Sequence, residues 1–234
     1  MWSYYGSKSK IVNYYPMPKY DTIIEPFAGS ACYSLKYYNH NIILCEKYKI
    51  IYDIWNWLIH EATPKEILQY VDFKAGQDIS SLPIREEHKN LIGFCINRGS
   101  VRPGHIVQKW SCQVAKRPDW ASTTNFALLR IAKFLPKIKH WEIINSSYEE
   151  IPNQKATWFI DPPYKYGGQH YIINNIDYEE LTNFCLSREG QVIVCENTKA
   201  NWLPFKPLTS TYGQHHKSTE AIWLNEENNL LKYF

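Results

Sequence analysis

The sequence predicts an α/β fold in which buried parallel strands alternate with helices. Runs of mainly β-branched or apolar residues at 22–24, 41–45 and 158–160 are each followed directly by an acid. Strands that are buried on both faces of a parallel sheet read as near-continuous apolar runs. Open sheets of this kind bind ligands just beyond the carboxyl ends of their strands. We therefore expect a doubly wound sheet whose functional residues follow the strands.

The composition suits one large globular domain, or one domain that carries an insertion. The 234 residues are 44% hydrophobic and 21% charged, and the net charge is only +3. Contact with nucleic acid would then depend on a local basic patch. The six cysteines show no CxxC spacing, which indicates neither zinc nor a disulfide framework. With no signal peptide and no apolar run of membrane-spanning length, we expect a soluble, cytoplasmic protein without membrane contact.

The first 20 residues are rich in Tyr, Lys and Ser. Tyr4 and Tyr5 precede a Gly-Ser turn and Lys8, and a helix is expected over residues 11–15, before Pro16. Two interpretations are open. The segment is either a solvated arm or a lid in which a lysine meets an anionic group.

Residues 22–31 read as a strand followed by a turn of small residues, with a helix starting at Cys32. Gly29 lets the backbone approach a ligand closely, and this arrangement receives nucleotide-like ligands in doubly wound folds. Glu46 ends the next strand, 17 residues after Gly29. Acids that bind ribose hydroxyls lie ~20 residues beyond such a turn. Glu46 is either a ribose ligand or a solvated loop acid, and the preceding turn favours the ribose role. An amphipathic helix is expected over residues 50–59.

Residues 64–140 break this alternation and read as a polar, mainly helical insertion. Basic residues gather here with aromatic residues between them, and the loop at residues 97–104 carries Arg98 and Arg102. The arginine fork suits phosphate groups and guanine edges. A solvated helical subdomain is the alternative, but basic clustering in a chain of little net charge favours nucleic-acid contact.

A third strand is expected at residues 141–144, and the run at residues 158–160 leads into Asp161, Pro162, Pro163 and Tyr164. The two prolines fix their own backbone and remove two N–H donors. The result is a stiff rim with exposed carbonyls, an acid beside it and an aromatic ring. Such a rim could hold a flat group that carries N–H donors. A proline turn with Asp161 as an ordinary turn residue is the alternative.

Beyond this rim, the loop at residues 165–176 contains two glycines and reads as a mobile cover. A helix over residues 178–186, capped by Asp177, and a strand at residues 191–195 follow. We expect the chain to end in a β-hairpin formed by residues 218–224 and 229–231.

These motifs together resemble the Dam-type adenine-specific DNA methyltransferases. Five of them follow the family's order over most of the chain: residues 4–8, 25–29, 46, 161–164 and 217–220. The resemblance implies a Rossmann-like methyltransferase sheet with helices on both faces, formed by residues 1–63 and 141–234. It also implies an inserted, mainly helical DNA-recognition subdomain at residues 64–140. Two positions depart from the family: Ala31 replaces a common second glycine, and Ser147 replaces an Asp that many members carry in the strand leading to the catalytic motif.

The resemblance implies S-adenosylmethionine as cofactor, S-adenosylhomocysteine as product and no metal. Lys8 would meet the carboxylate of the cofactor's amino-acid tail, and Glu46 would meet its ribose hydroxyls. The implied cofactor-binding residues are Tyr4, Lys8, Glu25, Pro26, Phe27, Ala28, Gly29, Glu46, Ser147 and Asp161.

The implied catalytic residues are Asp161, Pro162, Pro163 and Tyr164. The Asp161 carboxylate and the Pro162 carbonyl would accept the two N–H groups of the adenine amine. The carboxylate would stabilise the positive charge that develops on the nitrogen, and Tyr164 would stack on the base after it is flipped out of the duplex.

The implied partner is double-stranded DNA, contacted by Arg98, Arg102, Lys109 and Lys217. A restriction endonuclease is a functional counterpart that such enzymes can have, and the site of action would be a bacterial cell, or the host cell of a phage. An RNA methyltransferase of similar fold and a non-catalytic nucleic-acid-binding relative are the alternatives. The intact catalytic motif argues against the second alternative, and Asp161 argues against cytosine N4 methylation, which usually has Ser at that position.

Overall fold

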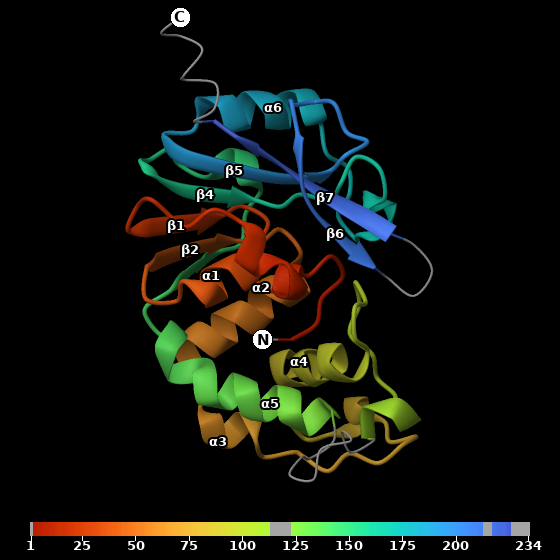
Figure 1. The fold of residues 1–234 in the computed structure, drawn as a ribbon. Helices are drawn as coiled ribbons and strands as arrows, with labels where there is room; N and C mark the ends of the chain where they lie inside the picture. The colour runs from red at the N-terminus through yellow and green to blue at the C-terminus, as the bar shows by residue number, and fades with distance from the viewer. Residues whose placement is uncertain (1, 113–122, 213–216, 226–234) are drawn as a thin grey trace, which may run out of the picture. The chain divides into compact units, whose positions relative to one another are not determined.

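The computed structural model describes residues 2–112, 123–212 and 217–225 (Figure 1). The chain divides into two compact units. The sheet unit comprises Lys8–Tyr48 and Glu142–Phe234, and the helical unit comprises Met1–Ser7 and Lys49–Trp141. The domain boundaries expected from the sequence stay a prediction. Across the described ranges, no helix is both long enough and apolar enough to span a membrane.

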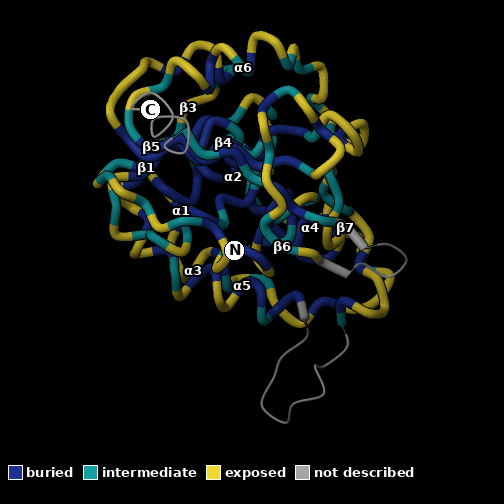
Figure 2. The backbone as a smooth tube through the Cα atoms, turned by 45° about the horizontal axis from the view of Figure 1, so that its top comes forward, coloured by how far each residue is buried: buried dark blue, intermediate teal, exposed yellow. Residues whose placement is uncertain are grey.

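The sheet unit is built on a seven-stranded sheet with the order β3-β2-β1-β4-β5-β7-β6. The first five of these strands run parallel, whereas β7 is antiparallel to both β5 and β6. Apolar runs in the sequence predicted the parallel strands, and three of them, β1, β4 and β5, are buried along most of their length (Figure 2). The strands are β1 (Thr22–Glu25), β2 (Asn41–Cys45), β3 (Glu142–Ile144), β4 (Ala156–Ile160), β5 (Gly190–Asn197), β6 (Lys206–Tyr212) and β7 (Lys217–Leu224).

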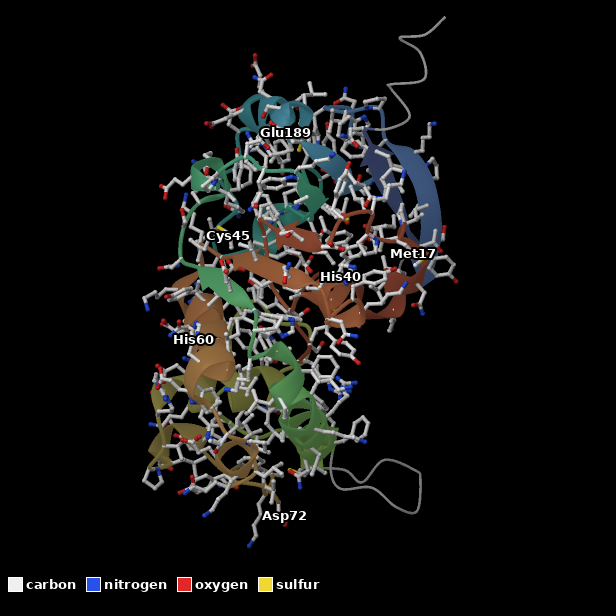
Figure 3. The ribbon with its side chains drawn as sticks, turned by 90° about the vertical axis from the view of Figure 1, so that its left-hand side faces the viewer. Met17, His40, Cys45, His60, Asp72 and Glu189 are labelled. Carbon is white, nitrogen blue, oxygen red and sulfur yellow. The ribbon has the colours of Figure 1, made fainter. Side chains whose placement is uncertain are left out.

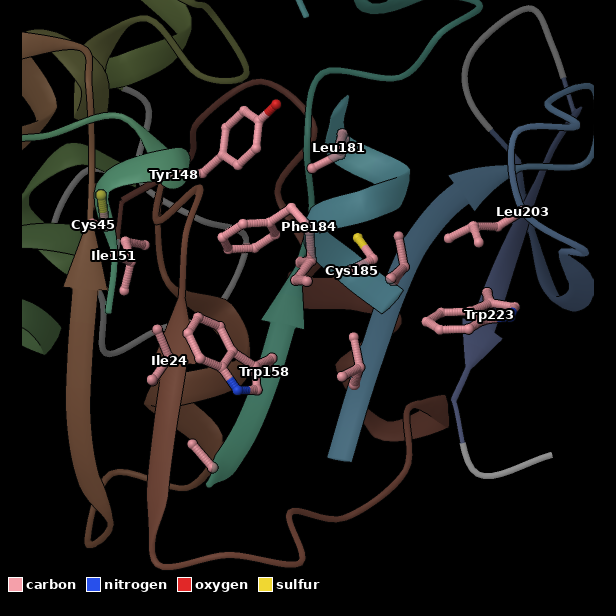
Figure 4. Close-up of a cluster of buried hydrophobic side chains, with 14 residues drawn as sticks. Ile24, Cys45, Tyr148, Ile151, Trp158, Leu181, Phe184, Cys185, Leu203 and Trp223 are labelled. Atoms are coloured by element: carbon pink, nitrogen blue, oxygen red, sulfur yellow. The ribbon is translucent and has the colours of Figure 1, made fainter. Parts of the chain in front are cut away.

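Helices cover both faces of the sheet, and β4 contacts helices on both, since its alternate residues point to opposite sides. On one face Trp158 packs against Phe184 of α6 (Tyr178–Ser187), within a buried cluster that includes Ile24 and Val192 (Figure 4). On the other face Phe159 stacks on Tyr33 of α1 (Cys32–Lys36), with ring centroids 4.3 Å apart. The predicted fold class, a Rossmann-like α/β sheet with helices on both faces, is confirmed.

Short helices complete the sheet unit. The predicted helix over residues 11–15 is only a 3₁₀ turn, η2 (Val12–Tyr14), preceded by η1 (Lys8–Lys10). The other two are η7 (Tyr148–Glu150) and η8 (Gly168–His170). The predicted cap of α6 is confirmed, since the Asp177 carboxylate accepts the backbone N–H groups of residues 179 and 180.

The prediction of the terminal hairpin was wrong about one of its two strands. Residues 218–224 do form most of β7, but β7 pairs with β6, which precedes it. The sequence did not predict β6, because this strand contains Pro207 and polar residues and has no apolar run. Proline is tolerated there because β6 lies at the edge of the sheet. Residues 229–231 lie outside the described part of the chain.

The helical unit is predominantly helical where it is described, as expected for the insertion. Trp55 packs between Trp2 and Trp141 in its core. The expected helix over residues 50–59 is α2 with a π-helical extension, η3. The elements are α2 (Lys49–Asn56), η3 (Trp57–Glu61), α3 (Pro64–Ile67), η4 (Ile79–Ser81), α4 (Glu86–Ile96), η5 (Lys109–Cys112), α5 (Thr123–Phe134) and η6 (Leu135–Ile138).

Candidate functional site

Three acids lie at the carboxyl ends of neighbouring parallel strands. Glu25 ends β1, Glu46 follows β2, and Asp161 follows β4. The strand order reverses at β1, which has β2 on one side and β4 on the other. Open α/β sheets bind ligands in the crevice outside such a reversal. The predicted positions of Glu46 and Asp161 at this edge of the sheet are confirmed.

Asp161 forms a buried ion pair with Lys8. The Lys8 Nζ atom lies 2.8 Å from Asp161 Oδ1, and the two side chains are only 8% and 19% exposed. Burial raises the pKa of Asp161 to about 6 in spite of the lysine beside it. Burial acts to lower the pKa of Lys8, but the carboxylates of Asp161 and Glu220 outweigh it and hold that pKa above its ordinary value. The lysine therefore stays charged at neutral pH, whereas the pKa of Asp161 lies about one pH unit below neutral.

A second buried carboxylate, Glu220 of β7, joins this cluster. Its Oε1 atom accepts the hydroxyl of Tyr15 at 2.7 Å and also the hydroxyl of Tyr164, and it lies 3.7 Å from Lys8 Nζ. The same ammonium sits 4.6 Å from the centroid of the Tyr164 ring. Burial raises the pKa of Tyr164 well above its ordinary value, so the phenol stays protonated and donates. The predicted aromatic group is thus held beside the predicted acid.

Hydrogen bonds to α6 and β5 hold the loop that carries the Asp-Pro-Pro-Tyr motif. The Tyr178 hydroxyl donates to the Pro163 carbonyl at 2.7 Å. The carboxylate of Glu196, at the end of β5, accepts the Lys165 backbone N–H at 2.9 Å and the Trp202 indole N–H at 3.1 Å. The expected role of the Pro162 carbonyl as an acceptor for a ligand stays a prediction.

Gly168 packs directly on this loop. Its backbone N–H donates to the Tyr164 carbonyl at 2.9 Å. A Cβ atom at Gly168 would lie 2.9 Å from the Pro163 carbonyl carbon, closer than real Cβ contacts come. Gly167 has a φ of +109°, a conformation that favours glycine. The glycine pair therefore lets the following loop fold tightly against the motif.

Glu46 ties β2 to the turn after β1. Its two carboxylate oxygens accept the backbone N–H groups of Gly29 and Tyr48, each at 2.9 Å. Burial raises the pKa of Glu46, while these two N–H groups act to lower it. Gly29 and Ala31 both adopt left-handed backbone with φ of +46°. Glycine is favoured in that region, so Ala31 has a backbone conformation that suits glycine better than alanine.

Other residues expected to bind cofactor have structural partners. Glu25 is buried and accepts the backbone N–H of Ser34 in α1 at 2.7 Å, and burial raises its pKa to about 8. Phe27 packs on Tyr148, with ring centroids 5.2 Å apart. Pro26 and Ala28 are buried in the same turn, and the Ala28 backbone N–H donates to the Cys45 carbonyl.

Ser147 and Tyr4 are the remaining residues expected to bind cofactor. The resemblance placed Ser147 in the strand that leads to the catalytic motif. In the structure it lies after β3 and directly before η7 instead, and its hydroxyl accepts the Lys47 ammonium at 3.3 Å. Tyr4 belongs to the helical unit, where it is buried against Phe94 with ring centroids 5.6 Å apart.

The expected DNA-contact residues Arg98, Arg102 and Lys109 are exposed in the helical unit. The end of the loop that carries the two arginines packs closely against α4. A Cβ atom added at Gly93 of α4 would lie only 2.6 Å from the Cβ atom of Pro103 in that loop. Lys217 begins β7, and its side chain lies outside the described part of the chain.

Among the described side chains, no group of three or more His, Cys, Asp or Glu residues is placed to hold a metal. The structure also adds functional candidates that the sequence did not single out: Tyr15, Glu196 and a role for Glu220. Glu220 falls within the late motif, at residues 217–220, but nothing in its sequence surroundings connects it with Tyr15, 205 residues away.

The chain matches no protein-family model and no curated protein. Similar solved structures include a conserved hypothetical protein of Streptococcus pyogenes, with a TM-score of 0.35 and 11% identity over 88% of this chain and 86% of that one. Another is described as "Putative methyltransferase yhhF" of Escherichia coli, with a TM-score of 0.32 and 10% identity over 86% of this chain and 74% of that one. At these scores and identities, neither likeness carries a conclusion about function.

Proposed function

We propose that this chain is a DNA adenine N6-methyltransferase that uses S-adenosylmethionine. The observation that carries the proposal is the environment of the Lys8 ammonium, which lies 2.8 Å from the Asp161 carboxylate and 4.6 Å from the centroid of the Tyr164 ring. An N–H donor at this place meets an acid and an aromatic face together. A flipped adenine needs the same two contacts, the acid for its amine and the aromatic face for its ring.

The residues of the β1–α1 turn fit the nucleoside part of the cofactor. Left-handed backbone at Gly29 and Ala31 bends the chain beside Glu46. A carboxylate has about four lone-pair positions, so Glu46 can accept ribose hydroxyls in addition to its backbone donors. When bound, S-adenosylmethionine supplies a methyl group activated by a sulfonium and leaves as S-adenosylhomocysteine.

The chain's own contribution to the reaction is to orient and stabilise the amine. The lone pair of an adenine amine is conjugated with the ring, which makes it a weak nucleophile. Ionised Asp161 and the Pro162 carbonyl accept its two N–H groups, which favours a pyramidal nitrogen whose lone pair points away from the ring. The carboxylate also stabilises the positive charge that develops on this nitrogen. Braced by Tyr178, Glu196 and Gly168, the loop holds these groups in place before the base arrives.

Duplex DNA is the proposed substrate. An adenine in a duplex presents its amine to such a site only after it leaves the base stack. Tyr164 offers the stacking face for the extracted base. Exposed Arg98, Arg102 and Lys109, together with Lys217, are the proposed contacts to the DNA backbone or bases. Each phosphate contact contributes to affinity in a salt-dependent way.

The direct test is transfer of labelled methyl from S-adenosylmethionine to unmethylated genomic DNA, with structured RNA as a parallel substrate. We expect incorporation into DNA, and a loss of at least about 100-fold when Asp161→Asn removes the carboxylate charge at nearly constant shape. Binding of S-adenosylhomocysteine, measured by calorimetry, shows whether the variant keeps the cofactor site. Incorporation into RNA alone would favour an RNA methyltransferase. Cofactor binding without transfer to either would favour a non-catalytic nucleic-acid-binding protein.

A further inference from the structure

Lys8 is a buried cation shared by two buried carboxylates. Its Nζ atom lies 2.8 Å from Asp161 Oδ1 and 3.7 Å from Glu220 Oε1, and the Glu220 side chain is 9% exposed. A buried charge is costly unless it keeps a partner of opposite sign. The free energy of the folded protein therefore depends on Lys8 always having at least one carboxylate beside it.

The function proposed above creates a conflict at this lysine. The target adenine has to bring its amine to the Asp161 carboxylate and its ring to the face of Tyr164, and the Lys8 ammonium contacts both groups. Lys8 cannot resolve the conflict by losing its proton, because the neighbouring carboxylates hold its pKa above the ordinary value. The ammonium has to move, and it has to keep a carboxylate partner as it does so.

Glu220 is placed to be that partner. A movement of about 1 Å would bring Lys8 Nζ from its 3.7 Å separation to an ordinary hydrogen-bond distance from Glu220 Oε1. The carboxylate is already fixed, because it accepts the hydroxyls of Tyr15 and Tyr164. It also lies on β7, a strand that contributes no residue of the Asp-Pro-Pro-Tyr motif. The receiving group therefore comes from a different strand than Asp161, and the Tyr164 hydroxyl links it to the loop that binds the base.

Resting on the proposed function, we propose that Glu220 is a positioning residue that takes over the Lys8 ammonium when Asp161 binds the target amine. Lys8 thereby closes the amine site in the free enzyme and moves aside without losing its ion pair. Without the charge of Glu220, Lys8 has less reason to leave Asp161 and competes with the base.

The test compares Glu220→Gln with the wild type in steady-state methylation of unmethylated genomic DNA. The glutamine side chain keeps an oxygen that can accept the two tyrosine hydroxyls but loses the charge. We expect KM for DNA to rise about tenfold while kcat changes less than about threefold. Glu189→Gln is the matched control: this exposed glutamate lies just before β5, at the amino end of the strand (Figure 3), and its substitution should leave both constants unchanged.

Lys8→Met separates the proposed role from a merely structural one. In the Lys8→Met background the competing ammonium is gone, so adding Glu220→Gln should change KM less than about twofold. A KM for Glu220→Gln that equals the wild-type value would overturn the proposal. An equal rise in KM with and without Lys8 would also overturn it, because Glu220 would then act through another group.

A stability measurement tests the ion pair without reference to any substrate. In urea unfolding, Lys8→Met and Glu220→Gln should be non-additive by about threefold or more in the unfolding equilibrium constant, as expected for charges that interact. Additive effects would overturn the counter-ion role whatever the protein methylates. If this coupling is present but the wild type transfers no methyl to DNA, the proposed function fails while the ion pair stands.

Discussion

Replacing Gly168 with alanine would place a methyl group against the backbone of the site loop. The new Cβ would lie 2.9 Å from the Pro163 carbonyl carbon and 3.1 Å from Pro163 Cβ. Because the first contact involves backbone, either the proline or residue 168 has to move by several tenths of an ångström. Overpacking of this kind costs about 1–3 kcal/mol. The expected fall in the melting temperature is roughly 2–4 °C for each kcal/mol in a chain of this size.

The effect of Gly168→Ala on turnover should exceed its effect on stability. A misplacement of about 1 Å at a reacting group can cost about 100-fold in rate, so a shift of about half that size at Pro163 and Tyr164 should cost about tenfold in kcat. The assay is methyl transfer at saturating DNA and cofactor, well below the melting temperature of the variant. Gly76→Ala is the control, since alanine there has to adopt a φ of +84° but meets no atom within 4 Å. The control should lose stability but keep kcat. A wild-type kcat in Gly168→Ala would refute the view that this close contact positions the motif.

Three further predictions concern Asp161, the start of β5 at Gly190, and Ala31 in the turn between β1 and α1. Since transfer needs ionised Asp161 and burial raises its pKa to about 6, kcat/KM should fall as the pH drops through about 6, to roughly a tenth of its plateau at pH 5. A profile that stays flat down to pH 4.5 would contradict this. Gly190→Ala should prevent stable folding, because its Cβ would lie 2.2 Å from the Ala156 carbonyl oxygen at a φ of +99°; a melting temperature close to that of the wild type would be the opposite result. Ala31→Gly should raise stability in urea unfolding by up to about 1 kcal/mol, because it relieves left-handed backbone at φ +46°. A lower midpoint would show that Ala31 gains more from packing than it loses to strain.

The strands and the acids at their ends could be predicted because they rest on local sequence. An apolar run of three to five residues identifies a buried strand, and the residue that follows it lies at the carboxyl edge of the sheet whatever the rest of the chain does. Glu46 and Asp161 were placed correctly for this reason. The cap of α6 by Asp177 is equally local. Strand β6 escaped detection because an edge strand tolerates polar residues and Pro207.

The partners within the site could not be predicted, because they come from distant parts of the sequence. Glu220 meets Tyr15 across 205 residues and Tyr164 across 56 residues. The role of Glu25 in binding cofactor stays a prediction, and its contact with the Ser34 backbone N–H in α1 is a further partner that the sequence did not indicate. Pairings of this kind depend on strand order and register, which no local pattern contains.

The most direct measurement is the nucleoside composition of DNA from cells that lack adenine methylation and express this chain. Mass spectrometry after digestion should detect N6-methyladenine in DNA from cells that produce the wild type, and none above background in DNA from cells that produce Asp161→Asn at equal level. Sequencing of the modified positions should then place them in one recurring sequence. Unmodified adenine in the wild-type sample, with the protein folded and able to bind S-adenosylhomocysteine, would contradict the assignment of Asp161 and Tyr164 to adenine methylation in DNA.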